Sequence, residues 1–280
     1  MNVLYIRQEQ IVGYQAWLCE QERERSTIEK YGCCVTAFVN WLDGRPLTKE
    51  DAVAWKEELK SRCAPATVNA SLAALNGFFR FIGRDDCRLK FLKVQRRVFR
   101  DQTRELTQQE FRRLVEAAAA HGKTRLALLL ETIGGTGIRV GEVRYITVEA
   151  AQTGKAEIAL KGKIRTILLP SKLCRTLLKY AKKQGIGSGA IFRTRTGKLL
   201  TRRQIWAEMK SICKAAGVDG SKVFPHNLRH MFAVAFYRAC RDVVKLADVL
   251  GHSSIDTTRI YLMTSEKEHQ RQLDRLRLVS

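Results

Sequence analysis

The sequence predicts a mainly α protein built from two domains. Its 280 residues allow two ordinary domains, and 45% of them are apolar, which is enough to form sizeable cores. Most of the chain shows the spacing of successive amphipathic helices, and one stretch alternates apolar and polar residues as paired strands do. These observations favour a helical first half and a mostly helical α+β second half with a small antiparallel sheet.

Four helices are predicted in the first half, beginning with residues 8–22. Ser26 and Glu29 have the spacing of a capping box and predict the start of the second helix. Thr48 predicts the start of the third helix, and Pro65 lies where proline favours the first turn of the fourth. Four helices of this length form a compact unit.

A basic segment separates the two halves. Residues 88–104 carry seven basic residues and one acid, and they show no clean apolar stripe. This pattern predicts a linker and a boundary near residue 100, which gives domains over residues 1–99 and 100–280. The same composition is also typical of a solvated connector without a further role.

The second half begins with a helix at Thr107, which has capping-box spacing to Glu110. An apolar helix that ends in glycines follows, and residues 156–170 then predict a β-hairpin with Gly162 in its turn. Further helices are predicted over residues 171–185, 201–217, 225–240, 242–251 and 255–261, and a last one follows Ser265 and Glu268. This half is therefore mostly helical with one small sheet.

The charge balance predicts a polyanionic partner. Fifty basic residues against 28 acidic ones give a net charge of +22, which favours nucleic acid, with an anionic membrane surface as the main rival. Because charged and apolar residues are mixed along the whole chain, a disordered basic tail is excluded. No stretch approaches about 18 consecutive apolar residues, so no transmembrane helix is expected.

The chain is expected to work in the cytoplasm. Its N-terminal residues lack the basic and apolar regions of a signal peptide. Its eight cysteines show no CxxC pair, so neither a disulfide framework nor a structural zinc site is expected.

Polar residues that interrupt the apolar elements form a set suited to attack on a phosphodiester without a metal ion. Two arginines can clamp the non-bridging oxygens, a lysine can protonate the leaving oxygen, and histidines can handle the proton of the nucleophile. A tyrosine would be the nucleophile, and it needs activation because its unperturbed pKa is about 10. No matching carboxylate cluster for a two-metal site accompanies the set, so no metal is expected. The residues are Arg139, Lys161, His226, Arg229, His252 and Tyr261.

Each of these residues alone fits an ordinary structural role. A single arginine in a helix is usually exposed, and a His-x-x-Arg pair such as His226 and Arg229 often caps a helix or forms an ion pair. Tyr261 alone would be a core aromatic residue with its hydroxyl at the edge. Only the order and spacing of the whole set indicate chemistry.

Four segments in their order resemble the tyrosine recombinase, or phage integrase, family: TGIRVGEV, LKGKIRT, PHNLRH and LGHSSIDTTRIY. The motifs extend from Arg139 to Tyr261, and their combination is highly specific. The family pattern of Arg, Lys, His-x-x-Arg, His or Trp, and Tyr falls on the six residues named above. Anchoring on the strand before the turn favours Lys161 over Lys163 as the lysine. Glu142 matches an acid that usually supports the site structurally in this family.

This resemblance implies a site-specific DNA recombinase, or integrase. The tyrosine would form a 3′-phosphotyrosine link and free a 5′-hydroxyl, which would attack a partner duplex. Four copies of the chain would exchange strands between two double-stranded DNA sites through a Holliday junction, without a cofactor. The first domain resembles the family's SAM-like core-binding domain, and the chain would form a C-shaped clamp on DNA. Lys93, Arg96 and Arg97 of the linker would contact phosphates.

The two ends of the chain carry further expectations. The core-binding helices begin almost at Met1, so the resemblance implies a minimal Xer-like or mobile-element recombinase without an arm-binding domain. Near the other end, Leu273, Leu276 and Val279 form an apolar stripe. This stripe fits docking on its own domain or, by analogy with the family, packing on a neighbouring protomer.

Two alternative functions remain open. A type IB topoisomerase uses a similar residue set, and a decayed recombinase would bind DNA without cutting it. The compact helical first domain and the spacing of nine residues from His252 to Tyr261 favour the recombinase over the topoisomerase. The complete residue set argues against a protein that only binds.

Overall fold

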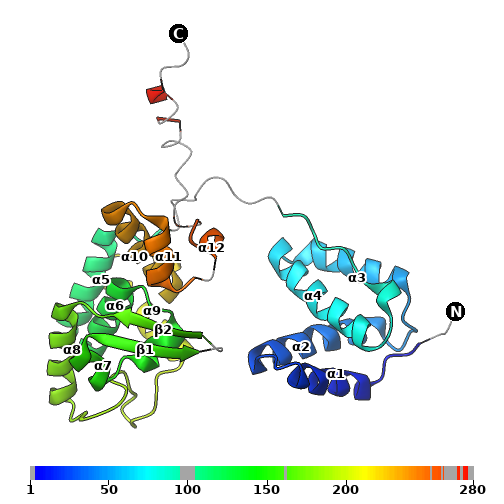
Figure 1. The fold of residues 1–280 in the computed structure, drawn as a ribbon, viewed down its shortest axis with the longest axis horizontal. Coiled ribbons are helices and arrows are strands. Elements are labelled where there is room, and N and C mark those ends of the chain that lie inside the picture. The colour runs from blue at the N-terminus through cyan, green and yellow to red at the C-terminus, as the bar shows by residue number, and fades with distance from the viewer. Residues whose placement is uncertain are drawn as a thin grey trace. The chain divides into compact units, whose positions relative to one another are not determined.

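The computed structural model describes residues 4–94, 105–160, 163–252, 254–259, 261, 270–271 and 274–276. The chain divides into two compact units, residues 1–96 and 97–280 (Figure 1). This division falls at residue 96, against residue 99 in the sequence-based prediction. In the described residues, helices dominate both units and one small sheet lies in the second, so the predicted fold class is confirmed.

The first unit packs four α-helices around an aromatic core. Tyr14, Phe38, Phe78 and Phe79 have fully buried side chains. The rings of Tyr14 and Phe78 meet edge to face with their centroids 5.4 Å apart, a favoured aromatic geometry. The described elements are α1 (Gln8–Glu20), α2 (Arg25–Leu42), α3 (Lys49–Arg62), α4 (Pro65–Phe81) and the 3-10 helix η1 (Asp85–Cys87).

The predicted capping box at the start of the second helix is wrong. The helix begins at Arg25, and Ser26 lies inside its first turn. Glu29, the expected partner of Ser26, instead forms an ion pair with Arg25 at 2.9 Å. The carbonyl of Glu24 accepts the first backbone hydrogen bond, from Thr27 at 2.7 Å. An ion pair one turn apart thus replaces the expected side-chain cap.

Two asparagines of α4 hold the chain that leaves the first unit. Asn76 pairs with both backbone groups of Leu89, donating to its carbonyl at 2.9 Å and accepting from its N–H at 2.8 Å. Asn69 does the same with Leu92, at 3.0 and 2.8 Å. Each side-chain amide thereby supplies the donor and the acceptor that a neighbouring strand would supply.

Lysines of α3 contact the same stretch of chain. Lys49 donates to the carbonyl of Arg88, and Lys56 donates to the carbonyl of Lys90 at 2.8 Å. Four side chains from two helices therefore hold residues 88–92 against the first unit.

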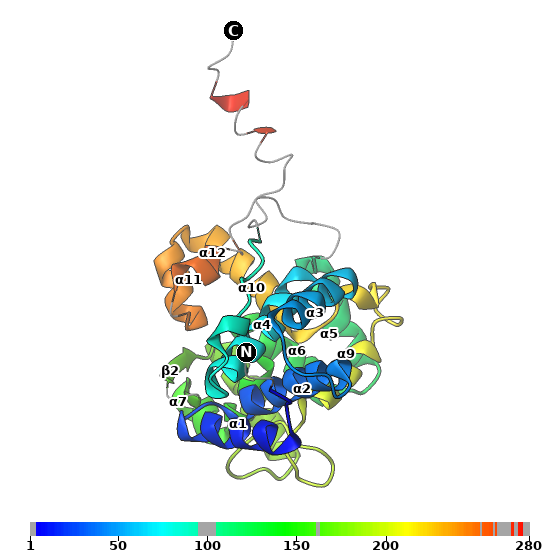
Figure 2. The ribbon, with the colours of Figure 1, turned by 90° about the vertical axis from the view of Figure 1, so that its right-hand side faces the viewer.

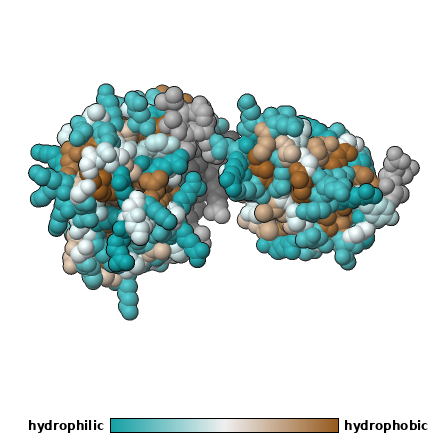
Figure 3. Space-filling model, turned by 90° about the horizontal axis from the view of Figure 1, so that it is seen from below, coloured by the Kyte–Doolittle hydropathy of each residue, from teal (hydrophilic) through white to brown (hydrophobic). Residues whose placement is uncertain are grey.

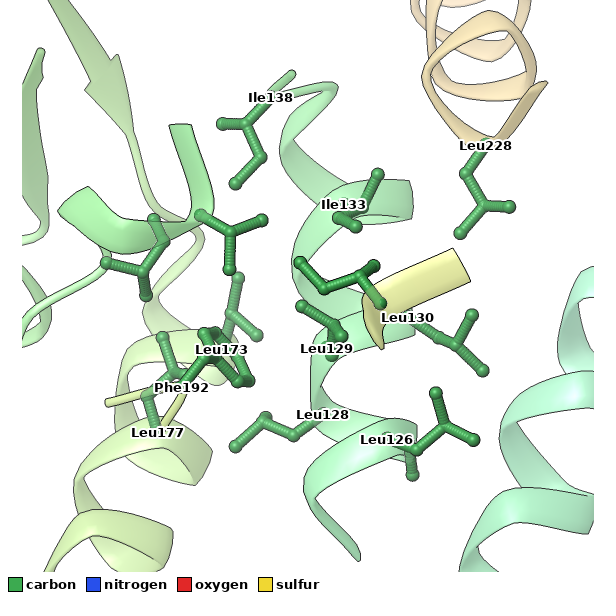
Figure 4. Close-up of a cluster of buried hydrophobic side chains, with 14 of the residues drawn as sticks. Leu126, Leu128, Leu129, Leu130, Ile133, Ile138, Leu173, Leu177, Phe192 and Leu228 are labelled. Carbon is green, nitrogen blue, oxygen red and sulfur yellow. The ribbon is translucent and has the colours of Figure 1, made fainter. Parts of the chain in front are cut away.

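In the second unit, α6 (Thr124–Thr136) is a core helix with apolar side chains on nearly all sides. Leu126, Leu129, Leu130 and Ile133 project from it in different directions, and Figure 4 shows them with side chains from neighbouring elements. The other described elements here are α5 (Gln108–Ala120), η3 (Val140–Tyr145), α7 (Val148–Thr153), β1 (Lys155–Leu160), β2 (Lys163–Leu168), α8 (Ser171–Lys183), α9 (Arg202–Lys210), η4 (Gly220–Lys222), α10 (Pro225–Cys240), α11 (Val243–Leu250) and α12 (Ile255–Arg259).

The predicted hairpin is confirmed as the antiparallel pair β1 and β2. Its register runs from Lys155 opposite Leu168 to Leu160 opposite Lys163. Gly162, the predicted turn residue, lies outside the described residues. Side chains alternate along β2, so that Ile167 is buried while Leu168 is exposed.

Helices α10, α11 and α12 form one corner of the second unit (Figure 2). Asp242 caps α11 by accepting from the N–H groups of Val244 and Lys245, at 2.9 and 3.0 Å. Gly251 ends the same helix in the left-handed conformation, with φ of 61°. The predicted last helix, including Leu273 and Val279, lies largely outside the described residues.

Hydrophilic side chains cover most of both units on the face shown in Figure 3. This surface is consistent with the net charge of +22. No helix in the described ranges is both long enough and apolar enough to cross a membrane.

We expect Asn76→Ala to lower the free energy of unfolding of the first unit by about 1–3 kcal/mol, because both backbone groups of Leu89 lose their partner. Asn40→Ala, at an exposed position of α2, is the control and should change it by less than about 0.5 kcal/mol. Urea unfolding followed by tryptophan fluorescence measures both values. Equal midpoints for the two variants would contradict the role given to Asn76.

Candidate active site

Five of the six predicted catalytic residues lie in the described part of the second unit, and four separate elements supply them. Arg139 precedes η3, His226 and Arg229 lie on α10, His252 follows α11, and Tyr261 follows α12. Hydrogen bonds and ring stacking bring Arg139, Arg229, His252 and Tyr261 together at the end of α11. The sixth residue, Lys161, lies outside the described residues, and its alternative Lys163 is the first residue of β2.

Arg229 is the most deeply buried charged residue of this group, with 2% of its surface exposed. Its Nη1 donates to the carbonyl of Gly137 at 2.6 Å, and its Nη2 donates to the carbonyl of Leu250 at 2.8 Å. Gly137 ends α6 and Leu250 is the last residue of α11. Because carbonyl oxygens at helix C-termini carry partial negative charge, two helices together compensate the buried cation.

Three arginines converge on the C-terminal end of α11. Arg165 and Arg229 both donate to the carbonyl of Leu250, and Arg139 donates to that of Gly251 at 3.3 Å. The side chain of Arg139 is 44% exposed, so it is the arginine best able to reach a bound anion. The result is a concentrated positive charge of the kind that binds phosphate.

Glu142 is the buried acid between two of these arginines. Only 2% of its surface is exposed. It accepts from Arg139 Nη1 at 3.1 Å and from the backbone N–H of Arg139 at 2.7 Å, and it forms a second ion pair with Arg165. One carboxylate thus orients two guanidinium groups.

Arg165 was not among the residues predicted from the sequence. It lies on β2 in the same alternating series as Ile167, which faces the core. A charged residue at an inward position of a strand needs a partner. The alternation of residues along β2 could therefore have marked Arg165 as a paired, inward-facing residue. The Arg165 side chain also passes under Gly251, where a Cβ atom would overlap it. Gly251 is therefore required both for its positive φ and for this close approach.

His252 is held by hydrogen bonds at both ring nitrogens. Its Nε2 lies 2.9 Å from Arg229 Nη2, and its Nδ1 lies 2.8 Å from Thr258 Oγ1. Partial burial and the positive charges of Arg229 and Arg139 lower the pKa of His252 to about 4. The imidazole is therefore neutral at physiological pH. Thr258, like Arg165, was missed from the sequence.

The Tyr261 side chain is 3% exposed and packs against Ala233, Leu246 and Leu250. Its ring stacks on that of His252 with a centroid distance of 5.9 Å and an interplanar angle of 14°. Burial lowers the pKa of Arg229, and the interaction with Tyr261 opposes that shift. The candidate nucleophile therefore lies beside both the buried arginine and the neutral histidine.

His226 lies at the start of α10, directly after Pro225. Desolvation and the positive charges of Arg229 and Arg139 lower its pKa. That His226 belongs to the site stays a prediction. Within the described ranges, no group of three or more His, Cys, Asp or Glu side chains is arranged to hold a metal ion.

The predicted DNA contacts of the linker are only partly described. Lys93 follows the chain segment that α3 and α4 hold, whereas Arg96 and Arg97 lie outside the described residues.

A comparison with family models matches residues 104–268 to the phage integrase family. The chain therefore belongs to this family and is a tyrosine recombinase, an enzyme that transfers DNA strands. Among curated relatives, tyrosine recombinase XerA of Pyrococcus furiosus is 26% identical over 98% of this chain and 96% of its own length. Tyrosine recombinase XerC of Roseiflexus castenholzii is 29% identical over 93% of this chain and 91% of its own length.

Solved structures show the same fold. A lambda integrase dimer bound to a COC' core site has a TM-score of 0.74 and 19% identity, and the match covers 93% of this chain and 77% of that one. XerH recombinase bound to difH substrate has a TM-score of 0.69 and 18% identity, covering 97% of this chain and 90% of that one.

We expect Glu142→Gln to lower the free energy of unfolding by about 1–3 kcal/mol, because Arg139 and Arg165 would lose their shared counter-charge in a buried position. Glu157→Gln, on an exposed position of β1, is the matched control. Urea unfolding measures the difference. An unchanged midpoint in Glu142→Gln would show that the two ion pairs add nothing to stability.

Stability should fall as the pH is lowered from about 6.5 toward 4. The folded pKa of His252 is about 4 and that of His226 is also lowered, whereas the unfolded value is about 6.5. In this window the unfolded chain binds more protons, so acidification favours unfolding, and above about 6.5 the effect levels off. Because carboxylates titrate nearby, the test compares unfolding curves of wild type and His252→Gln across this range. The variant should show a shallower pH dependence, and identical slopes would contradict the lowered pKa.

Proposed function

We propose that the chain is a site-specific DNA recombinase in which Tyr261 attacks a DNA phosphodiester. A bond forms between the tyrosine oxygen and phosphorus while the bond from phosphorus to O5′ breaks. The products are a 3′-phosphotyrosine link and a free 5′-hydroxyl. The observation that carries this proposal is that the buried Arg229 contacts His252, whose ring stacks on that of Tyr261.

The other residues of the site have separate roles in this reaction. Arg139 and Arg229 bind the non-bridging oxygens and stabilise the charge of the transition state. The histidines, His226 and His252, handle the proton of the attacking tyrosine and add hydrogen bonds to the phosphate. Lys161 protonates the leaving O5′, with Lys163 as the alternative donor.

Strand exchange follows from the same chemistry. The free 5′-hydroxyl attacks the phosphotyrosine of the partner duplex, which releases the tyrosine and joins the strands. Because the phosphotyrosine link keeps the bond energy, rejoining needs no nucleotide cofactor. Four protomers would hold two sites and pass through a Holliday junction. This is supported by the fold shared with a lambda integrase tetramer bound to a Holliday junction, at a TM-score of 0.74 and 18% identity.

The first unit and the linker would supply DNA affinity. The positive charge of the chain and the fixed path of residues 88–92 toward Lys93 support contacts to the phosphate backbone. Such contacts release counterions, so affinity should fall steeply with salt. Arg96 and Arg97 extend the same basic segment.

The test is covalent capture on nicked suicide substrates made from a pool of genomic DNA fragments, in the presence of EDTA. Wild type should give a DNA–protein adduct on denaturing gels, and Tyr261→Phe should give none, because it lacks the attacking oxygen. Tyr237→Phe is the matched control, since Tyr237 packs in the same cluster and should still form the adduct. Sequencing the captured DNA would locate the cleavage site.

The alternative functions give different outcomes. Tyrosine-dependent relaxation of supercoiled plasmid that lacks any captured site would indicate a type IB topoisomerase. DNA binding by the wild type without any adduct over the whole pool would indicate a protein that binds without cutting. Either result would overturn the recombinase proposal.

A further inference from the structure

Arg165 ties the β1–β2 hairpin to the rest of the candidate site. It lies on β2 opposite Ile158, and its side chain is 15% exposed. One guanidinium nitrogen donates to the carbonyl of Leu250 at the end of α11, and the other forms an ion pair with Glu142 of η3. A single side chain of the hairpin therefore contacts two other elements of the site.

The acceptors of Arg165 are shared with the two arginines that the proposed function assigns to the phosphate. The carbonyl of Leu250 also accepts from Arg229 at 2.8 Å, and Glu142 also accepts from Arg139 at 3.1 Å. Arg165 therefore places the hairpin directly relative to both of those guanidinium groups.

The guanidinium of Arg165 constrains the hairpin in a way that the apolar contacts of the strands do not. Ile158 and Ile167 are buried in the core, but apolar packing has no preferred direction. At the open end of the hairpin, the N–H of Leu169 donates to the carbonyl of Gly154 at 2.9 Å. Arg165, by contrast, has a planar group whose donors are in fixed relative positions.

The hairpin carries the lysine that the proposed function assigns to the leaving group. In the register of the strands, the last pair before their connection is Leu160 opposite Lys163. Lys161 follows Leu160 in the sequence, so both candidate lysines are within four residues of Arg165. At the usual rise per residue, Arg165 lies about 7 Å along the strand from Lys163. The attachment at Arg165 is therefore close to the connected end of the hairpin.

We propose that Arg165 is a positioning residue that holds the hairpin, and with it the lysine that protonates the leaving O5′, in place beside Arg139 and Arg229. The inference rests on the proposed function, because that function gives the lysine its role. Protonation of a leaving oxygen needs a donor within hydrogen-bond reach. A misplacement of about 1 Å can slow a reaction about 100-fold, so a fixed hairpin matters for the rate.

This role concerns the leaving group alone, which separates it from a role in supporting the end of α11. If Arg165 served the nucleophile or the phosphate through Leu250, its loss would slow cleavage whatever the leaving group. If it places the lysine, its loss should matter only when the leaving atom needs a proton.

The test compares two DNA substrates that differ in one atom. Both carry the site recovered by covalent capture, one with the ordinary O5′ and one with sulfur in that position. A thiolate leaves without protonation because thiols are much stronger acids than alcohols, so the sulfur substrate does not need the lysine. Adduct formation is timed on both substrates with the same sample of full-length protein. The ratio of the two rates then does not depend on the fraction of folded protein.

Two variants of Arg165 are measured against a control. Arg165→Met keeps the length of the side chain and removes its donors. It should slow cleavage of the oxygen substrate on the order of 10- to 100-fold and change cleavage of the sulfur substrate by less than about threefold. Arg165→Lys keeps the charge but has one nitrogen in place of two, and it should show the same selective loss to a smaller extent. Arg175→Met, at an exposed position of α8, should match the wild type on both substrates.

Lysine variants provide the reference behaviour. Lys161→Ala or Lys163→Ala, whichever removes the acid, should show the selective loss in full. Combining that variant with Arg165→Met should add little further loss on the oxygen substrate, because the residue that Arg165 positions is already absent.

The outcomes distinguish this inference from the proposed function. Selective loss in either variant of Arg165 supports the positioning role. Equal slowing on both substrates in Arg165→Met and Arg165→Lys, or an unchanged rate on the oxygen substrate, would overturn it. Failure of the proposed function looks different, because the wild type would form no adduct on either substrate or sulfur would rescue neither lysine variant.

Discussion

The buried guanidinium of Arg229 is the interaction on which the second unit's site depends. It joins Gly137 at the end of α6 to Leu250 and His252 at the end of α11, which are far from Gly137 in the sequence. Burial of a charge is costly unless its donors are paired, and here two helix C-termini provide the acceptors. The guanidinium that holds these elements together therefore also lies beside the candidate nucleophile. One residue meets both a requirement of packing and a requirement of function.

Patterns within short segments were well predicted from the sequence, because local periodicity and turn chemistry determine them. The hairpin, the apolar helix α6 and the capping box at Thr107 are examples, the last with the backbone nitrogen of Glu110 3.1 Å from the threonine oxygen. Ser26 shows the limit of such patterns, because the helix starts at Arg25 and Glu29 pairs with Arg25 instead of capping.

Contacts between distant segments were not predicted. Arg165 and Thr258 act through Leu250 and His252, which lie on other elements, and nothing in their local sequence reveals those partners. The motif residues were found because their types and order are diagnostic as a set. Of the supporting residues, Glu142 was found by the same pattern, whereas geometry is needed to find Arg165 and Thr258. The catalytic roles of the six motif residues and the DNA contacts of Lys93, Arg96 and Arg97 remain predictions.

The paired asparagines of α4 have a geometric consequence for the linker. Seven residues of helix rise about 10.5 Å, and the three residues from Leu89 to Leu92 span about 10 Å when extended. These two distances match, so the amides of Asn69 and Asn76 can hydrogen-bond Leu92 and Leu89 in only one register. An insertion between positions 89 and 92 would break that match, whereas one placed after residue 94 would leave it intact. Linker length can therefore change during evolution without any cost to the folding of the first unit.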